Sequence, residues 1–276
     1  MVMSVANSPA VIETPLNKDA LWQRVRAGAQ NIADAEPLLV DFVTDSVLER
    51  DNLEEALAFI LANRLRHAGV SAELSRKAFC EALKIEPDIA DAMRVDLAAT
   101  VERDPASHRA IEPVLYFKGF HALQTHRFAH AMYNSGRKDF ALYLQSRSSQ
   151  VYQVDIHPAV KVGCGVMLDH GTGIVIGETA TIGDHVSILQ GVTLGGTGKE
   201  EGDRHPKVGN GVLIGAGAKI LGNINIGHGS LVAAGSVVLK DVPSHTTVAG
   251  VPAKVIGKTS CSEPGCVMDQ MVAPLE

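Results

Sequence analysis

Two short polar segments of the chain contain the residue types best suited to chemistry. The first is Asp169-His170-Gly171-Thr172-Gly173, and the second, residues 195–207, ends in Asp203-Arg204-His205-Pro206-Lys207. Histidine has an unperturbed pKa of about 6.5 and exchanges protons near neutral pH. Arginine binds a carboxylate through two parallel hydrogen bonds. Proton transfer and the binding of a small anion are therefore the chemistry to expect at these segments.

Both segments interrupt a repeat in which aliphatic residues return every six positions. The step is eight from Leu168 to Ile176 and fourteen from Leu194 to Val208. A fixed short period with glycines at the turns is the signature of a β-helix, and departures from a consistent pattern tend to mark functional sites. The repeating aliphatics are Ile156, Val162, Leu168, Ile176, Ile182, Ile188, Leu194, Val208, Ile214, Ile220, Ile226, Val232 and Val238.

The strands of this predicted solenoid are short and face a narrow interior. A second small or branched residue precedes most of the repeating aliphatics by two positions, and alternate residues of a strand point to the same side. An α/β domain of buried strands is the alternative, but it requires helical segments between the strands. The sequence from 154 to 238 contains none, so we favour the β-helix.

Residues 18–150 show helical spacing instead. Leu21, Val25 and Ala29 lie on one stripe, and Pro87 opens a helix that ends before Asp104-Pro105. Such a domain can cap the open end of a β-helix, whose terminal strand would otherwise expose unpaired backbone groups, and can add an oligomer interface. We predict an α+β protein with a disordered N-terminus (1–17), a helical oligomerisation and capping domain (18–150), a β-helix catalytic domain (151–257) and a mobile tail (258–276).

Composition limits the possible partners. The formal net charge of −6 argues against nucleic acid as the main partner, and no apolar run is long enough to span a membrane. The cysteines, Cys80, Cys164, Cys261 and Cys266, lack the paired spacing of a zinc or redox site, so a reduced, cytoplasmic protein is expected. His126 and His130 lie on one helix face as a conceivable metal pair, but packing histidines without metal are the expectation.

Several motifs together resemble those of one enzyme family. They are Asp155-Ile156-His157-Pro158, Met167–His170, Gly173–Thr179, Gln190–Lys199 and Gly202–Lys207, with Tyr116–Gln124 and Arg103–Ala106 upstream. This combination closely resembles bacterial serine O-acetyltransferase, the first enzyme of cysteine biosynthesis, over about residues 18–258. The resemblance implies a left-handed β-helix, an exception to the usual right-handed crossover. It also implies homotrimers that pair through their helical domains into a hexamer.

The implied reaction moves an acetyl group from acetyl-CoA to the hydroxyl of L-serine. His170 matches the family's general base and Asp155 the carboxylate that orients it. His205 matches a second histidine of the site. We expect direct transfer, with Cys164 as a turn residue rather than an acyl carrier.

The resemblance also implies how substrates bind. Arg204 matches the residue for the serine carboxylate, Asp96 and Asp169 match those for the ammonium group, and His205 lies near both serine and thiol. L-Cysteine is the implied feedback inhibitor at this site. Acetyl-CoA is a co-substrate, and no bound cofactor or metal is expected. The residues that match the family's acetyl-CoA-binding positions are Gly196, Thr197, Ala216 and Ala234. Lys240 and Lys254 are candidates for binding the nucleotide end of acetyl-CoA.

Three alternatives stay open at this stage. Another hexapeptide acetyltransferase would share the repeat, the histidine and Gly250-Val251-Pro252-Ala253-Lys254. A γ-type carbonic anhydrase would place zinc on three histidines, for which His157, His170 and His205 are available. A scaffold without catalysis would leave both interruptions unexplained. Many family members insert a C-terminal isoleucine into O-acetylserine sulfhydrylase, whereas this chain ends in Leu275-Glu276, which puts that complex in doubt.

Overall fold

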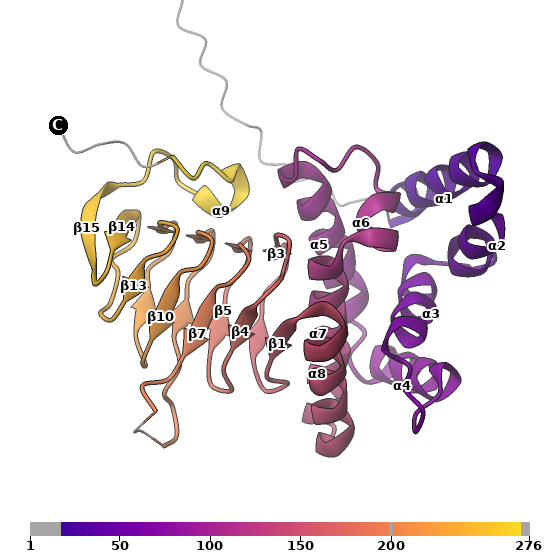
Figure 1. Ribbon diagram of the computed structural model, residues 1–276, viewed down its shortest axis with the longest axis horizontal. Coiled ribbons are helices and arrows are strands. Elements are labelled where there is room, and N and C mark those ends of the chain that lie inside the picture. The colour runs from indigo at the N-terminus through magenta and orange to yellow at the C-terminus, as the bar shows by residue number, and fades with distance from the viewer. Residues whose placement is uncertain (1–17, 199–200, 272–276) are drawn as a thin grey trace, which may run out of the picture.

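The computed structural model describes residues 18–198 and 201–271, which form a helical half and a solenoid half joined end to end (Figure 1). The predicted disordered segment 1–17 lies outside these ranges, as do residues 272–276 of the predicted tail. The helical half reaches Tyr152, two residues beyond the predicted boundary.

The helical half is built from amphipathic helices with identifiable starts. Leu21, Val25 and Ala29 are buried on one face of the first helix, as the spacing predicts. The third begins where the Asn52 side chain accepts a hydrogen bond from the Glu55 amide at 2.9 Å, a regular N-cap. The helices are α1 (Lys18–Ala35), α2 (Val40–Val43), α3 (Leu53–Leu65), α4 (Ala72–Ile85), α5 (Ile89–Arg103), α6 (Ile111–Tyr116), α7 (Lys118–Asn134) and α8 (Lys138–Tyr152), with a 3-10 turn at Pro37–Leu39 and a π-helical turn at Thr44–Leu48.

The solenoid half winds through three parallel sheets. Sheet 1 has the order β1-β4-β7-β10-β13, sheet 2 has β11-β8-β5-β2, and sheet 3 has β15-β14-β12-β9-β6-β3. The final pair β14–β15 is antiparallel and closes the far end. The strands are β1 (Val154–Ile156), β2 (Lys161–Val162), β3 (Met167–Leu168), β4 (Ile174–Ile176), β5 (Thr181–Ile182), β6 (Ser187–Ile188), β7 (Thr193–Gly195), β8 (Lys207–Val208), β9 (Leu213–Ile214), β10 (Lys219–Leu221), β11 (Asn225–Ile226), β12 (Leu231–Val232), β13 (Val237–Val238), β14 (Thr246–Gly250) and β15 (Ala253–Lys258).

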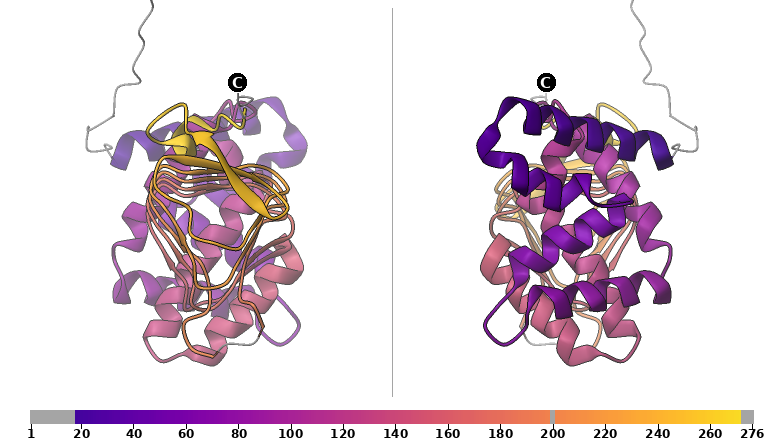
Figure 2. Two further views of the ribbon diagram at one scale, coloured as in Figure 1. Left: turned by 90° about the vertical axis from the view of Figure 1, so that its left-hand side faces the viewer. Right: turned by 90° about the vertical axis from the view of Figure 1, so that its right-hand side faces the viewer.

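The six-residue period fixes the core of the solenoid. Twelve of the thirteen repeating aliphatics are buried, and Val162 is partly buried. Because the strands stack in register, as Ile156 on Ile176 and Ile176 on Leu194 do, each aliphatic lies on the equivalent residue of the next coil. The predicted β-helix is confirmed. Figure 2 (left) looks along its axis and shows the coils behind one another.

Three corners connect the sheets, and each corner contains different polar residues. The first corner joins sheet 1 to sheet 2 and includes His157, residues 196–198 and residues 201–206. The second corner joins sheet 2 to sheet 3 and includes Cys164 and His185. The third corner joins sheet 3 to sheet 1 and includes residues 169–173. The two interruptions of the repeat therefore lie at opposite ends of the strands of sheet 1.

The C-terminal segment differs from the prediction of a mobile tail. After β15 it folds back over the second corner, and α9 (Pro264–Val267) packs against β9 and α5 (Figure 1). The Gly265 amide donates to Gly211 O at 2.9 Å, and Ser187 Oγ donates to Gly265 O at 2.6 Å. Backbone groups rather than aliphatic side chains hold much of this segment, which is why its low aliphatic content was misleading. Within the described ranges, no helix is apolar and long enough to cross a bilayer.

Candidate active site

The first interruption of the repeat forms a two-residue bulge at the third corner. The Asp169 amide donates to Ile188 O and the Gly191 amide donates to Thr172 O, so the chain is in register with the next coil on both sides. His170 and Gly171 are the two additional residues. Both have positive φ, 54° and 75°. Left-handed backbone is uncommon for a non-glycine residue and points to a functional constraint.

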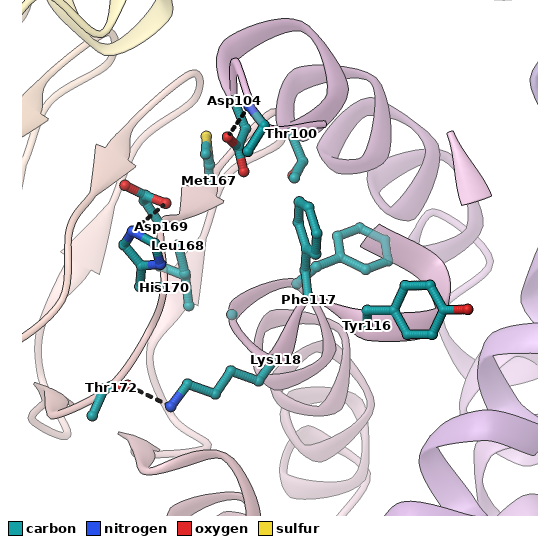
Figure 3. A pocket seen from close by; sticks show the side chains of 13 residues that line it. Thr100, Asp104, Tyr116, Phe117, Lys118, Met167, Leu168, Asp169, His170 and Thr172 are labelled. Carbon is teal, nitrogen blue, oxygen red and sulfur yellow. Dashed lines mark hydrogen bonds and ion pairs between the residues drawn. The ribbon is translucent and has the colours of Figure 1, made fainter. Parts of the chain in front are cut away.

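A cavity of about 320 Å³ opens between this bulge and the helical half. Figure 3 shows Asp169 and His170 on the solenoid side, with Asp104 and Thr100 on the helical side. His170 Nε2 lies 3.9 Å from Asp169 Oδ1, and the imidazole is 75% exposed, so it is free to reach a ligand. Burial raises the pKa of Asp169, and the neighbouring charge of Asp104 raises it further, while His170 opposes the shift. Two acids and a histidine thus share one cavity.

Helix α7 supports the bulge through very close packing. A Cβ added to Gly119 would lie 2.0 Å from Leu168 O, the carbonyl directly before Asp169. A Cβ on Gly171 would lie 3.0 Å from the Gly119 Cα. Beside this contact, Lys118 Nζ donates a hydrogen bond to Thr172 Oγ1 (Figure 3). These contacts with the helical half therefore fix the position of the His170 loop.

The second interruption builds a separate cluster at the first corner. Arg204 Nη2 donates to Glu178 at 2.8 Å, and His205 Nδ1 lies 2.9 Å from Thr179 Oγ1. The hydrogen bond from Arg204 lowers the pKa of Glu178. Burial lowers the pKa of His205 and of His157, which favours neutral imidazoles. This cluster combines a guanidinium group with histidines that can accept or donate protons near neutral pH.

Asp155 lies apart from His170 within one chain. It is on β1 at the edge of sheet 1, in a surface hollow with Gln145 and Ser149. The Gln145 amide donates to its carboxylate at 2.7 Å. Its charge acts on His157 of the first-corner cluster. The expected pairing of Asp155 with His170 is thus not made by contacts between the described residues of a single chain.

The structure does not support the predicted role of Asp96 in binding the ammonium group of the substrate. It is fully buried and forms a two-point ion pair with Arg127, at 2.7 and 2.9 Å. Gln124 and the Val166 amide complete its hydrogen bonds. A carboxylate that is buried and fully paired cannot take up a ligand's ammonium group. Asp104, eight residues on, lines the cavity and was not chosen as a site residue in the sequence analysis.

The residues expected to bind acetyl-CoA are divided between two corners. Ala216 and Ala234 lie at the third corner, on the coils that follow His170, and form a column of small side chains with Gly217 and Gly235. Gly196 and Thr197 begin the loop of the first corner. Lys240 and Lys254 are exposed near the far end of the solenoid. This column continues the line of Thr172 and Gln190 away from the bulge.

Other histidines and cysteines of the described residues have structural roles. His126 Nε2 bonds to Val160 O at 3.1 Å, and burial lowers its pKa to about 3, as expected of a packing histidine. His121 behaves in the same way, with a pKa of about 3. Cys164 lies in an exposed turn, and partial burial of its thiol raises the pKa of that group. Across the described ranges, no three His, Cys, Asp or Glu side chains are placed to hold a metal ion.

Comparisons with known proteins agree with this architecture. A family model described as serine acetyltransferase, N-terminal, matches residues 21–125, and one described as bacterial transferase hexapeptide (six repeats) matches residues 205–240. A serine acetyltransferase of Salmonella typhimurium is 51% identical over 252 residues, covering 91% of this chain and 92% of the relative.

Solved structures are equally similar. Serine acetyltransferase from Vibrio cholerae superposes with a TM-score of 0.91 at 52% identity, covering 92% of this chain and 98% of that one. The enzyme from Brucella abortus in complex with coenzyme A gives 0.87 at 56% identity, covering 88% and 97%. A serine acetyltransferase in complex with cysteine gives 0.90 at 48% identity, covering 93% and 100%.

Proposed function

Because this chain belongs to the serine acetyltransferase family and is an acetyl-CoA-dependent transferase, we propose that His170 is the general base of acetyl transfer to L-serine. The observation that carries this proposal is the position of His170, on a bulge where it adjoins Asp169 and faces Asp104 across one cavity. The two acids offer sites for the ammonium group of an amino acid. The imidazole lies within reach of the hydroxyl of the same ligand.

The reaction follows from this arrangement. His170 takes the hydroxyl proton of serine as the oxygen attacks the thioester carbonyl of acetyl-CoA. The C–O bond forms, the C–S bond breaks, and the imidazolium returns the proton to the departing thiolate. The products are O-acetyl-L-serine and CoA. His170 needs no covalent intermediate, so the acetyl group passes directly between the two substrates.

We propose that the complete site combines two copies of the chain. The third corner supplies His170 and the acids, whereas Arg204 and His205 lie at the first corner, across sheet 1. Serine carries both an ammonium group and a carboxylate, and a guanidinium group is well suited to the latter. Joining the first corner of one copy to the third corner of the next brings these groups together. Asp155 of one copy could then contact the His170 imidazole of the neighbouring copy.

Further assignments belong to the same proposal. L-Cysteine, which has the same α-amino and carboxylate groups as serine, would occupy the serine site as an inhibitor. Homotrimers would pair through their helical halves, for which Leu38, 90% exposed, offers an apolar contact. A cytoplasmic location accords with the four cysteines, all of which are free thiols in the described ranges. Any sulfhydrylase complex through the C-terminal end concerns residues 272–276, outside the described ranges.

Thiol release from acetyl-CoA tests the substrate and the base together. L-Serine, a sugar and a small amine are supplied as separate acceptors to the wild type and to His170→Ala. We expect release with L-serine alone, and its loss in the variant. Release only with another acceptor would show a different hexapeptide transferase. Release by His170→Ala at the wild-type rate would refute the role of the base.

Mixed assemblies test the shared site. His170→Ala and Arg204→Ala each remove one half of it, so each homo-oligomer should be nearly inactive. When the two variants are unfolded together and refolded, some sites receive an intact His170 and an intact Arg204 from different copies. Activity should then return to a fraction of the wild-type value. No recovery, with assembly confirmed by light scattering, would show that both halves come from one chain.

A further inference from the structure

One column of residues runs down the third corner directly beneath the catalytic histidine. The amide of Gly191 donates to Thr172 O, that of Gly217 to Gln190 O, and that of Gly235 to Ala216 O, each at 2.8 Å. These identical bonds put Thr172, Gln190 and Ala216 at the same position of successive coils, and strand register adds Ala234. His170 lies on the bulge just before Thr172, so Gln190 is one coil below it.

Gln190 is the long polar side chain in a column that continues with alanines. Its Oε1 is buried and has no hydrogen-bond partner among the described residues. A half-turn of the side-chain amide exchanges Oε1 and Nε2, so either group can be turned toward a ligand. Buried polar groups are almost always paired in native proteins. Gln190 as a whole is only half-buried, which leaves it accessible to a ligand.

The chemistry of the missing partner can be narrowed. An ammonium group only donates hydrogen bonds and a carboxylate only accepts them. A secondary amide does both, and therefore suits a glutamine amide in either orientation. The pantetheine arm of acetyl-CoA contains such amides, and the cysteamine amide is separated from the sulfur by only two carbons. Adjacent coils are about 4.8 Å apart, a spacing close to that from the amide nitrogen to the sulfur.

We propose that the side-chain amide of Gln190 binds the cysteamine amide of acetyl-CoA and so places the thioester beside His170. The inference rests on the proposed function, because it requires acetyl-CoA to lie along the third corner. With the cysteamine amide at Gln190, the rest of the arm follows Ala216 and Ala234, where small side chains leave room. The sulfur and the acetyl carbonyl then lie one coil higher, at the level of the bulge. Gln190 binds and positions; it exchanges no proton.

Two matched acetyl donors make the test specific. S-acetyl-N-acetylcysteamine keeps the cysteamine amide, whereas S-pentyl thioacetate replaces that amide with two methylenes. Thiol release to L-serine is measured with both donors for the wild type and Gln190→Ala. We expect the variant to lose about tenfold in kcat/KM with acetyl-CoA and with the amide donor. The rate with the pentyl donor and the KM for serine should stay within twofold of wild type.

The chain supplies controls for folding. Alanine already occupies this position in two other coils, so Gln190→Ala is expected to fold, and its melting temperature checks this. Gln190→Leu keeps the side-chain volume without the amide and should behave like the alanine variant. Gln30→Ala, on the exposed surface of α1, should leave every rate unchanged. Equal losses with both donors, or no loss with either, would overturn the inference. A wild type that releases no thiol with L-serine would remove the proposed function, and the inference with it.

Discussion

The contact between helix α7 and the His170 loop makes Gly119→Ala a sensitive perturbation. The added Cβ would lie 2.0 Å from Leu168 O and 3.0 Å from its carbonyl carbon. Non-bonded heavy atoms are most stable about 3.5–4.0 Å apart, so the helix and the loop must separate by about 1.5 Å. Both neighbours are backbone atoms and cannot rotate away. The displacement is therefore passed to Asp169 and His170, the next residues of the chain.

Two free-energy terms oppose each other in this variant. Alanine is favoured over glycine in a helix interior by about 1 kcal/mol, which is an upper bound for Gly119 in the first turn of α7. Gly119 has no positive φ that would strain a side chain. Overpacking a tight contact costs about 1–3 kcal/mol. The free energy of unfolding should thus fall by about 1 kcal/mol. A misplacement of about 1 Å can cost roughly 100-fold in rate, so activity should suffer far more than stability.

Steady-state kinetics and urea unfolding of the same preparations measure the two effects. Gly69→Ala is the matched control, because a Cβ there meets nothing within 4 Å and Gly69 has no positive φ. It should keep wild-type kcat and stability. We expect Gly119→Ala to lose kcat about 100-fold at a temperature where it remains folded. A variant with wild-type kcat would refute the argument that α7 sets the position of the base.

Three further predictions concern charged groups. Asp104→Asn should raise the KM for serine at least about tenfold without loss of stability. Asp96→Asn should instead lower the free energy of unfolding by about 3–5 kcal/mol, because it leaves the buried charge of Arg127 uncompensated. The reverse outcome in kinetics and urea unfolding would contradict our reassignment. His121 and His126 have folded pKa values of about 3, below the unfolded value of about 6.5. The unfolded chain therefore binds more protons below pH 6.5, and urea unfolding at pH 5.5 should show about 3 kcal/mol less stability than at pH 7.5. Arg103→Met removes the bonds to Gly165 O and Ser187 Oγ, so amide exchange in residues 259–271 should accelerate while α1 to α4 stay protected.

The solenoid was predictable because the six-residue period of the sequence is also the spacing of the residues that pack in its core. One inward position recurs in each strand, and parallel register stacks that position on its equivalent in the next coil. A six-residue repeat therefore identifies the core without knowledge of the fold's exterior. The interruptions were visible for the same reason. Register also identifies His170 and Gly171 as the inserted pair, which the spacing alone left open within five residues.

Asp104 was not chosen from the sequence, although it lies in the Arg103–Ala106 motif that carries the resemblance, and a local signal was also present. Asp96 lies three residues after Met93 and seven after Ile89, on the apolar stripe of α5, and so faces the core. Its partner Arg127 is on α7, a distance in sequence that no local pattern reveals. Asp104 follows the last residue of α5, where the chain turns toward the cavity. Helical periodicity separates the buried acid from the accessible one.

The proposed division of the site between two corners has a consequence for assembly. A contact between the first corner of one copy and the third corner of another joins unlike surfaces, so it is heterologous. Such contacts close into rings when the rotation permits and otherwise continue as filaments. A closed ring would give every histidine a guanidinium group, and a solenoid with three sheets can present two corners to its neighbours in the proposed ring of three.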